Sequence, residues 1–169
     1  MKKTRIVISC AMLAAISFAI GWICKTYMTF GAIRITFENI PIIIAGIAFG
    51  PVCGGAVGAV ADLLSCVSSG YSVNPIITIG SAAVGITAGL VSHYIVKKGK
   101  LQIFTSVMAA HIIGSMIVKS FGLYIMGYAL GIILCRIPLY MCIGIVEFYL
   151  IYMLLKNKSI QNEINRLKR

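Results

Sequence analysis

Acidic residues are scarce in this sequence. Only 4 of its 169 residues are Asp or Glu, against 15 Lys or Arg, and charged residues of both signs make up 11% of the chain. Hydrophobic residues make up 60%, which is more apolar surface than a soluble domain of this length can bury. The shortage of charge therefore excludes an ordinary soluble protein and favours an integral membrane protein.

The sequence also lacks the motifs of common enzyme classes. It has no GxxxxGK[ST] loop, and neither HExxH nor GxSxG occurs. The six cysteines form no CxxC pair and no cluster with zinc-ligand spacing, so small buried hydrophobes are the favoured interpretation. His93 and His111 are isolated, which is typical of packing residues in a helical bundle. We therefore expect no enzyme activity, no catalytic residue, no metal site and no cofactor of the chain's own.

Long apolar runs are what the sequence has in abundance. We expect six transmembrane helices, over residues 5–23, 37–50, 52–67, 74–96, 101–119 and 132–155. A spanning helix needs about 20 residues, so the second is short, and the Gly50-Pro51 break places a tight turn after it. The predicted fold class is all-α integral membrane protein, organised as one six-helix domain over residues 1–169.

The cations gather in three clusters along the chain. They are Lys2, Lys3 and Arg5 before the first span, Lys97, Lys98 and Lys100 after the fourth, and Lys156, Lys158, Arg166, Lys168 and Arg169 after the last. An even number of spans puts all three on one side, which the positive-inside rule makes the cytoplasm. Both termini are expected there, with residues 156–169 as a basic tail. Anionic lipid headgroups explain the net charge of +11 better than nucleic acid does.

Small residues recur at every fourth position in several spans, as membrane helices need for close approach. The rows are Gly46, Gly50, Gly54 and Gly58 around the predicted hairpin, Ser81, Gly85 and Gly89 in the fourth span, and Ala11, Ala15 and Ala19 in the first. Packing inside the bundle is the favoured interpretation of the glycine rows. The alanine row, which leads the chain, is a candidate docking face for another membrane protein.

Four cations remain after the clusters are counted: Lys25, Arg34, Lys119 and Arg136. The predicted topology places all of them in the outer half, where the positive-inside rule disfavours them, and ionisable groups inside a span cost about 2.5–3.5 kcal/mol each on insertion scales. An anion-binding pocket open to the outside is therefore the default hypothesis.

Two acidic residues lie near the same side, and the pattern leaves two roles open for them. Glu38 and Asp62 either neutralise Arg34 or Arg136 or contact the ligand themselves. Glu147 lies deeper and has no partner evident in the sequence, so a structural hydrogen bond is the favoured role.

Two outer loops complete the predicted site. The loop 21–37 contains Trp22, Tyr27 and Phe30, which form either an interfacial aromatic belt or a lid over a flat ligand. The polar loop 68–75 contains Tyr71, and Asn74 before Pro75 is a typical N-cap for the fourth span. The amides of that helix start favour an anion.

Three stretches resemble the substrate-binding S components of energy-coupling-factor vitamin importers, in particular the folate-type group. They are RITFENIP at 34–41, AGIAFGP at 45–51 and GGAVGAVADLL at 54–64, and Arg136 in the last span also fits. The entry to the fourth helix, GYSVNPIIT at 70–78, departs from the folate type, since only Tyr71 and Pro75 match it.

The resemblance implies a multi-pass protein of the prokaryotic cell membrane that binds one vitamin near the outer side. It implies as partners a transmembrane T component and two cytoplasmic ATPases, which use ATP, and an inward toppling movement of the S component. The AxxxA motif that contacts the T component corresponds to Ala11 and Ala15, and Ala19 continues the row. The ligand-site candidates that the outer charges and loops indicate are Arg34, Glu38, Asp62, Tyr71, Asn74, Lys119 and Arg136.

Other functions fit less of the sequence. An S component for a different anionic vitamin remains open. An autonomous secondary transporter would show inverted repeats, and no convincing repeat is visible. A membrane enzyme would need a convergent catalytic set, and a purely structural membrane partner leaves the outer cations unexplained.

Overall fold

The computed structural model describes residues 2–30, 33–70, 73–96 and 99–168, and almost all of them are helical. The elements in chain order are α1 (Lys2–Tyr27), β1 (Thr29–Phe30), β2 (Ile33–Arg34), α2 (Asn39–Phe49), α3 (Pro51–Ser68), α4 (Pro75–Leu90), η1 (Val91–Ile95), α5 (Gly99–Ala110), η2 (His111–Val118), α6 (Lys119–Ile125), α7 (Leu130–Lys156) and α8 (Lys158–Lys168). The segments η1 and η2 are π-helical. The two short strands pair antiparallel as a hairpin.

Among the described residues, five helices are long and apolar enough to cross a membrane: Lys3–Tyr27, Pro51–Ser68, Pro75–Ile95, Gly99–Ile125 and Leu130–Lys156. This confirms the predicted all-helical membrane fold. The predicted second span corresponds to α2, which has only 11 residues. At 1.5 Å per residue α2 is about 16 Å long, roughly half the thickness of a hydrocarbon core.

Two predicted boundaries are wrong in their position. The first helix continues to Tyr27, so Trp22 and Lys25 lie on α1 and not in the loop predicted over 21–37. The fifth span continues through η2 and α6 to Ile125, which places Lys119 inside a helix and not at its end. Trp22 and Tyr27 are 41% and 74% exposed, which favours the aromatic-belt interpretation over a lid.

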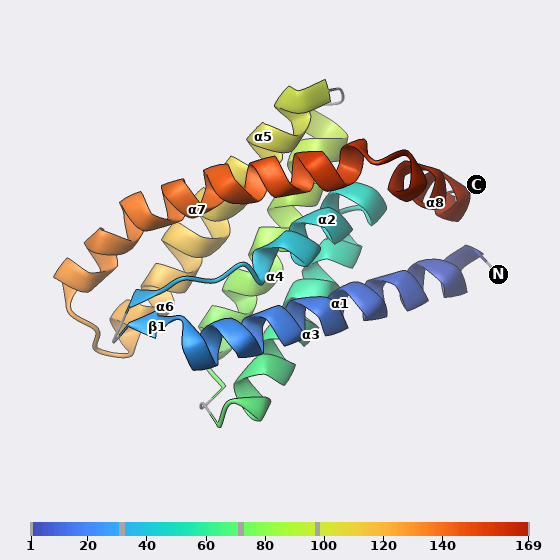
Figure 1. Ribbon diagram of the computed structural model, residues 1–169. Helices are drawn as coiled ribbons and strands as arrows, with labels where there is room; N and C mark the ends of the chain where they lie inside the picture. The colour runs from blue at the N-terminus through green and yellow to red at the C-terminus, as the bar shows by residue number, and fades with distance from the viewer. Residues whose placement is uncertain (1, 31–32, 71–72, 97–98, 169) are drawn as a thin grey trace.

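Both termini lie at the same end of the bundle, and the β1–β2 hairpin and α6 lie at the other (Figure 1). These are called the termini end and the hairpin end below. The short helix α2 lies between α1 and α7 and packs on both (Figure 1). The central helix α4 packs on α2, α3, α5 and η2, around a core that includes Ile42, Val57, Val84 and Val107.

A tight turn joins α2 to α3, as the sequence predicts. Gly50 has a φ of 100°, a left-handed conformation that favours glycine, and Pro51 begins the next helix. The proline ring suits the first helical position because its missing N–H has no partner to lose there.

The glycine rows pack against one another inside the bundle, which confirms the internal-packing interpretation. A Cβ atom added to Gly46 would lie 2.5 Å from the carbonyl oxygen of Gly85, and one added to Gly89 would lie 2.6 Å from Cα of Pro51. Gly54 and Gly85 bring the backbones of α3 and α4 into direct contact. In lipid, such close approach supplies the dispersion contacts that hold helices together.

We expect Gly85→Ala to lower the thermal unfolding midpoint of the detergent-solubilised protein by several degrees, because its methyl group would collide with the backbone of Gly54. Overpacking of this kind costs typically about 1–3 kcal/mol. The matched control is Gly131→Ala in α7, where nothing lies within 4 Å of the added atom. Fluorescence-detected size exclusion after heating measures both variants, and equal midpoints would contradict the packing argument.

Candidate functional site

A buried ion pair at the hairpin end joins Glu38, the residue before α2, to Lys119 of α6. Lys119 Nζ donates to Glu38 Oε1 at 3.4 Å, and the two residues are 6% and 8% exposed. The main-chain oxygen of Glu38 accepts a hydrogen bond from Ser17 Oγ at 2.6 Å, which fixes the start of α2 against α1.

Two glycines make the space for this ion pair. A Cβ atom on Gly21 of α1 would lie 2.6 Å from Glu38 Oε2, and one on Gly80 of α4 would lie 2.5 Å from Cγ of Lys119. The pair is therefore enclosed by helix backbones on two sides. Enclosure of this kind strengthens a charge–charge interaction because water cannot screen it.

Arg136 and Tyr140 lie one turn apart on α7, and both are buried. The guanidinium Nη2 donates to the Tyr140 hydroxyl at 3.1 Å, and the guanidinium carbon lies 5.1 Å from the centre of the ring. Arg136, Tyr140 and Asp62 lie in the electrostatic neighbourhood of Lys119. Polar and charged groups of α3, α6 and α7 thus share one region.

Asp62 and Asn74 each have a described hydrogen-bond partner. The sequence indicated the partner of Asn74 but not that of Asp62. Asp62 Oδ2 accepts a hydrogen bond from the Thr78 hydroxyl at 2.8 Å, across the α3–α4 contact. Asn74 Oδ1 accepts from the main-chain N–H of Ile76 at 2.9 Å, so the predicted N-cap is confirmed. Its side-chain oxygen is therefore engaged in starting α4.

The hairpin-end cluster is defined here by Glu38, Asp62, Thr78, Lys119, Arg136 and Tyr140. Four predicted site residues come together in it: Glu38, Asp62, Lys119 and Arg136. Lys25 is also buried, on α1, with its Nζ 3.8 Å from Cys66 Sγ on α3. Arg34 is described only as the β2 residue that pairs with Thr29, and Tyr71 lies outside the described residues.

The hairpin end therefore carries a surplus of buried positive charge. Among the side chains described there, the buried cations are Lys25, Lys119 and Arg136, and the buried carboxylates are Glu38 and Asp62. Removing such charges from water costs several kcal/mol per ion, and only good partners offset it. An anionic group placed among them would balance the charge.

Sequence reasoning left two roles open for Glu38 and Asp62, as partners of Arg34 or Arg136 or as ligand contacts. Among the described side chains, Glu38 pairs with Lys119 and Asp62 accepts a hydrogen bond from Thr78, and the side chain of Arg34 lies outside them. The partners Glu38 and Lys119 are 81 residues apart in the chain, and no sequence pattern indicates a contact across that separation.

A second buried pair lies deeper along α7. His111 Nε2 and Glu147 Oε2 are 2.7 Å apart, and the residues are 1% and 0% exposed. The structural hydrogen bond predicted for Glu147 is thus confirmed, and the apparently isolated His111 is its partner. Glu147 lies 11 residues beyond Arg136 on one helix, about 16 Å along its axis.

Asn39 is a candidate that sequence reasoning missed. It follows Glu38 at the start of α2, is 0% exposed, and neither its Oδ1 nor its Nδ2 has a hydrogen-bond partner among the described residues. Unpaired buried amides are rare in proteins and costly. The signal available was a polar residue directly after Glu38 in the RITFENIP stretch, at the start of an apolar helix.

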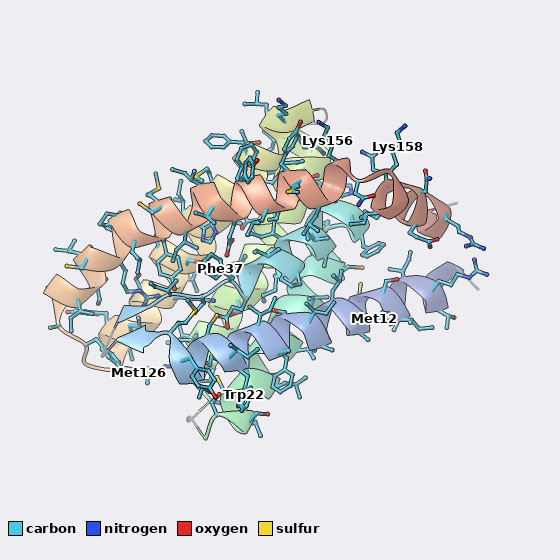
Figure 2. The ribbon with its side chains drawn as sticks, viewed as in Figure 1. Met12, Trp22, Phe37, Met126, Lys156 and Lys158 are labelled. Atoms are coloured by element: carbon cyan, nitrogen blue, oxygen red, sulfur yellow. The ribbon has the colours of Figure 1, made fainter. Side chains whose placement is uncertain are left out.

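The alanine row of α1 faces away from the bundle. Ala11, Ala15 and Ala19 are exposed, whereas Ala14 and Ser17 on the opposite face are buried. Met12, in the amino-terminal half of the same helix, is 62% exposed (Figure 2). The row is therefore a free, small-residue surface of the kind that permits close helix approach.

Comparisons with known proteins agree with this architecture. One solved structure, titled "Structure and mechanism of the S component of a bacterial ECF transporter", is similar with a TM-score of 0.66 and 25% identity, and the match covers 99% of each chain. A second, "Crystal structure of FolT bound with folic acid", has a TM-score of 0.65 and 19% identity, covering 84% of this chain and 89% of that one. A search of curated proteins gave no match.

The family model gives the assignment. A model described as "ECF transporter, substrate-specific component" matches residues 5–167, which is almost the whole chain. That family consists of substrate-binding components of transporters and is not a family of enzymes. This membrane-integral chain therefore belongs to the ECF transporter substrate-specific component family.

Proposed function

We propose that this chain binds an anionic vitamin at its hairpin end, with folate as the leading candidate. The observation that carries the proposal is the buried positive charge there, in which Lys25, Lys119 and Arg136 outnumber Glu38 and Asp62. Folate carries carboxylates and a flat pterin ring, so it offers both the missing negative charge and a surface for aromatic contact. The fold likeness to FolT, whose structure holds folic acid, supports the same ligand.

In this proposal the ligand anion competes with protein groups for the buried cations. Lys119 is held by Glu38 at 3.4 Å, which is a long distance for a charge-assisted hydrogen bond. A ligand carboxylate at 2.7–2.9 Å from the same ammonium would form the stronger interaction. Arg136, whose described partner is the neutral Tyr140 hydroxyl, is the second anchor.

We further propose that the chain works as one subunit of an importer in the prokaryotic cell membrane. A transmembrane T component and two cytoplasmic ATPases are its partners, ATP is used by those ATPases, and the chain needs no cofactor of its own. It would topple to carry its ligand inward. An S component for another anionic vitamin is the alternative. It is favoured by the low identity to FolT, 19%, and by the 70–78 segment, which departs from the folate type.

The proposed orientation places the termini end in the cytoplasm. Lys3, Arg5, Lys156 and Lys158 lie at that end (Figure 2 shows the two last), as the positive-inside rule requires. The short helix α2 then completes an even number of crossings. A reporter that is active only in the cytoplasm, fused to the carboxy terminus, tests this orientation and should be active. An inactive reporter on protein that is expressed and inserted in the membrane would reverse the orientation.

Lys119→Gln and Arg136→Gln should each weaken folate binding by about 30-fold or more. Truncating one partner of a buried charge pair costs about 2 kcal/mol or more, which corresponds to that factor. Isothermal titration with the detergent-purified protein measures the dissociation constants. Lys3→Gln at the termini end is the matched control and should bind folate as the unaltered chain does.

Two outcomes of that titration contradict parts of the proposal. Unchanged affinity in both variants would remove the hairpin-end cluster as the ligand site. If the unaltered chain binds folate no more tightly than about micromolar, far weaker than expected for a scavenging importer, folate is the wrong vitamin, although another anion can still occupy the site.

Replacing Ala11 or Ala15 by Leu should abolish uptake and leave ligand binding intact. Both residues are exposed on α1, so a larger side chain would keep a partner helix at a distance. Uptake by cells and titration with purified protein give the two readouts. Cys142→Leu, an exposed position on α7, is the control, and an equal loss of uptake there would argue against a specific docking face.

A further inference from the structure

A pocket lies at the termini end, away from the hairpin-end cluster. Its volume is about 590 Å³, and residues of α2, α5, α7 and α8 line it. The polar lining groups are Lys100 and Gln102 of α5, Tyr152 and Lys156 of α7, and Gln161 of α8. Because α5 begins at Gly99 and α7 ends at Lys156, the pocket lies at the ends of two helices long and apolar enough to cross a membrane.

The pocket carries positive charge that no described carboxylate balances. Lys100 and Lys156 both line it, none of its lining residues is acidic, and neither lysine forms an ion pair with a carboxylate in the described part of the chain. Lys100 Nζ instead lies 5.2 Å from the centre of the Tyr152 ring. Glu163 in α8 is engaged by Arg166, at 3.6 Å.

Other polar groups at the pocket suit a phosphate. The first turn of α5 begins at Gly99, which is itself a lining residue, and amides at a helix start favour negative charge. Gln161 adds an amide donor from α8. Gln102 contributes no donor to an anion, because its Nε2 already donates to the main-chain oxygen and the hydroxyl of Ser92, at 2.9 and 2.8 Å.

An apolar surface continues from the pocket toward the membrane interior. Ile103, Leu155 and Ile164 also line the pocket. The Tyr152 ring stacks on Phe148 with 6.1 Å between ring centres, and Phe148 meets Phe104 edge-on at 5.3 Å. Phe104 is 40% exposed, so this aromatic row borders lipid directly beside the charged pocket.

We infer that this pocket binds the phosphate-bearing headgroup of an anionic phospholipid from the leaflet at the termini end. Basic pockets between membrane helices at headgroup depth recognise such lipids. The adjoining aromatic row offers a surface for the acyl chains, which a soluble phosphate would leave unused. A bound headgroup would also join the ends of α5 and α7, whose ammonium groups otherwise repel. The inference is independent of which vitamin the hairpin end takes.

Native mass spectrometry of the purified full chain tests this inference. The probes are phosphatidylglycerol and phosphatidylcholine with identical acyl chains. The unaltered chain should bind phosphatidylglycerol about 30-fold more strongly than phosphatidylcholine, given two lysines at the headgroup. The Lys100→Gln/Lys156→Gln double variant should lose that preference, and Lys100→Arg/Lys156→Arg should keep it. Gln161→Glu places a negative charge on α8 and leaves both lysines unchanged, and it should weaken the preference for phosphatidylglycerol.

The matched control is Lys3→Gln/Arg5→Gln, which removes two cations from the same end but outside the pocket lining. It should retain the full preference. An equal loss in both double variants, or equal retention of the two lipids by the unaltered chain, would overturn the inference. Displacement of the bound lipid by millimolar inorganic phosphate would assign the pocket to soluble phosphates and overturn the lipid headgroup as its ligand.

Discussion

The charge buried at the hairpin end is the constraint on which the rest of the structure depends. In a bilayer, each ionisable group within a span costs about 2.5–3.5 kcal/mol on insertion scales, yet α1, α3, α6 and α7 each contribute such a group there, and Glu38 adds another just before α2. The Lys119–Glu38 pair recovers part of that cost at 3.4 Å. A cluster this expensive is understandable as the recognition surface for a ligand that carries the opposite charge.

The glycine rows are what make the cluster geometrically possible. Gly46, Gly54 and Gly85 press the backbones of α2, α3 and α4 together, so little space remains between these three helices. Toward the hairpin end, Gly21 and Gly80 do the reverse and leave room for the side chains of Glu38 and Lys119. The same residue type thus closes the bundle at one level and opens it for a charged pair at another. The exposed alanine row of α1 leaves one outer face free for a partner.

Sequence reasoning predicted the features that depend on local chemistry. Apolar length indicated the membrane helices, Gly50-Pro51 indicated the turn, and Asn74 before Pro75 indicated the N-cap, because each follows from backbone geometry within a few residues. The pairings could not be predicted in this way. Glu38 meets Lys119, and His111 meets Glu147, across separations of 81 and 36 residues. Those contacts depend on how whole helices pack, which the spacing of charges along the chain does not encode.

The central proposal is that the buried cations at the hairpin end hold an anionic vitamin. The most direct measurement is the identification, by mass spectrometry, of the small molecule that remains bound when the chain is purified gently from its native membrane. We expect a ligand with at least one carboxylate, stoichiometric in the unaltered chain and depleted in the Lys119→Gln variant. A neutral or cationic ligand retained equally by both proteins would contradict it.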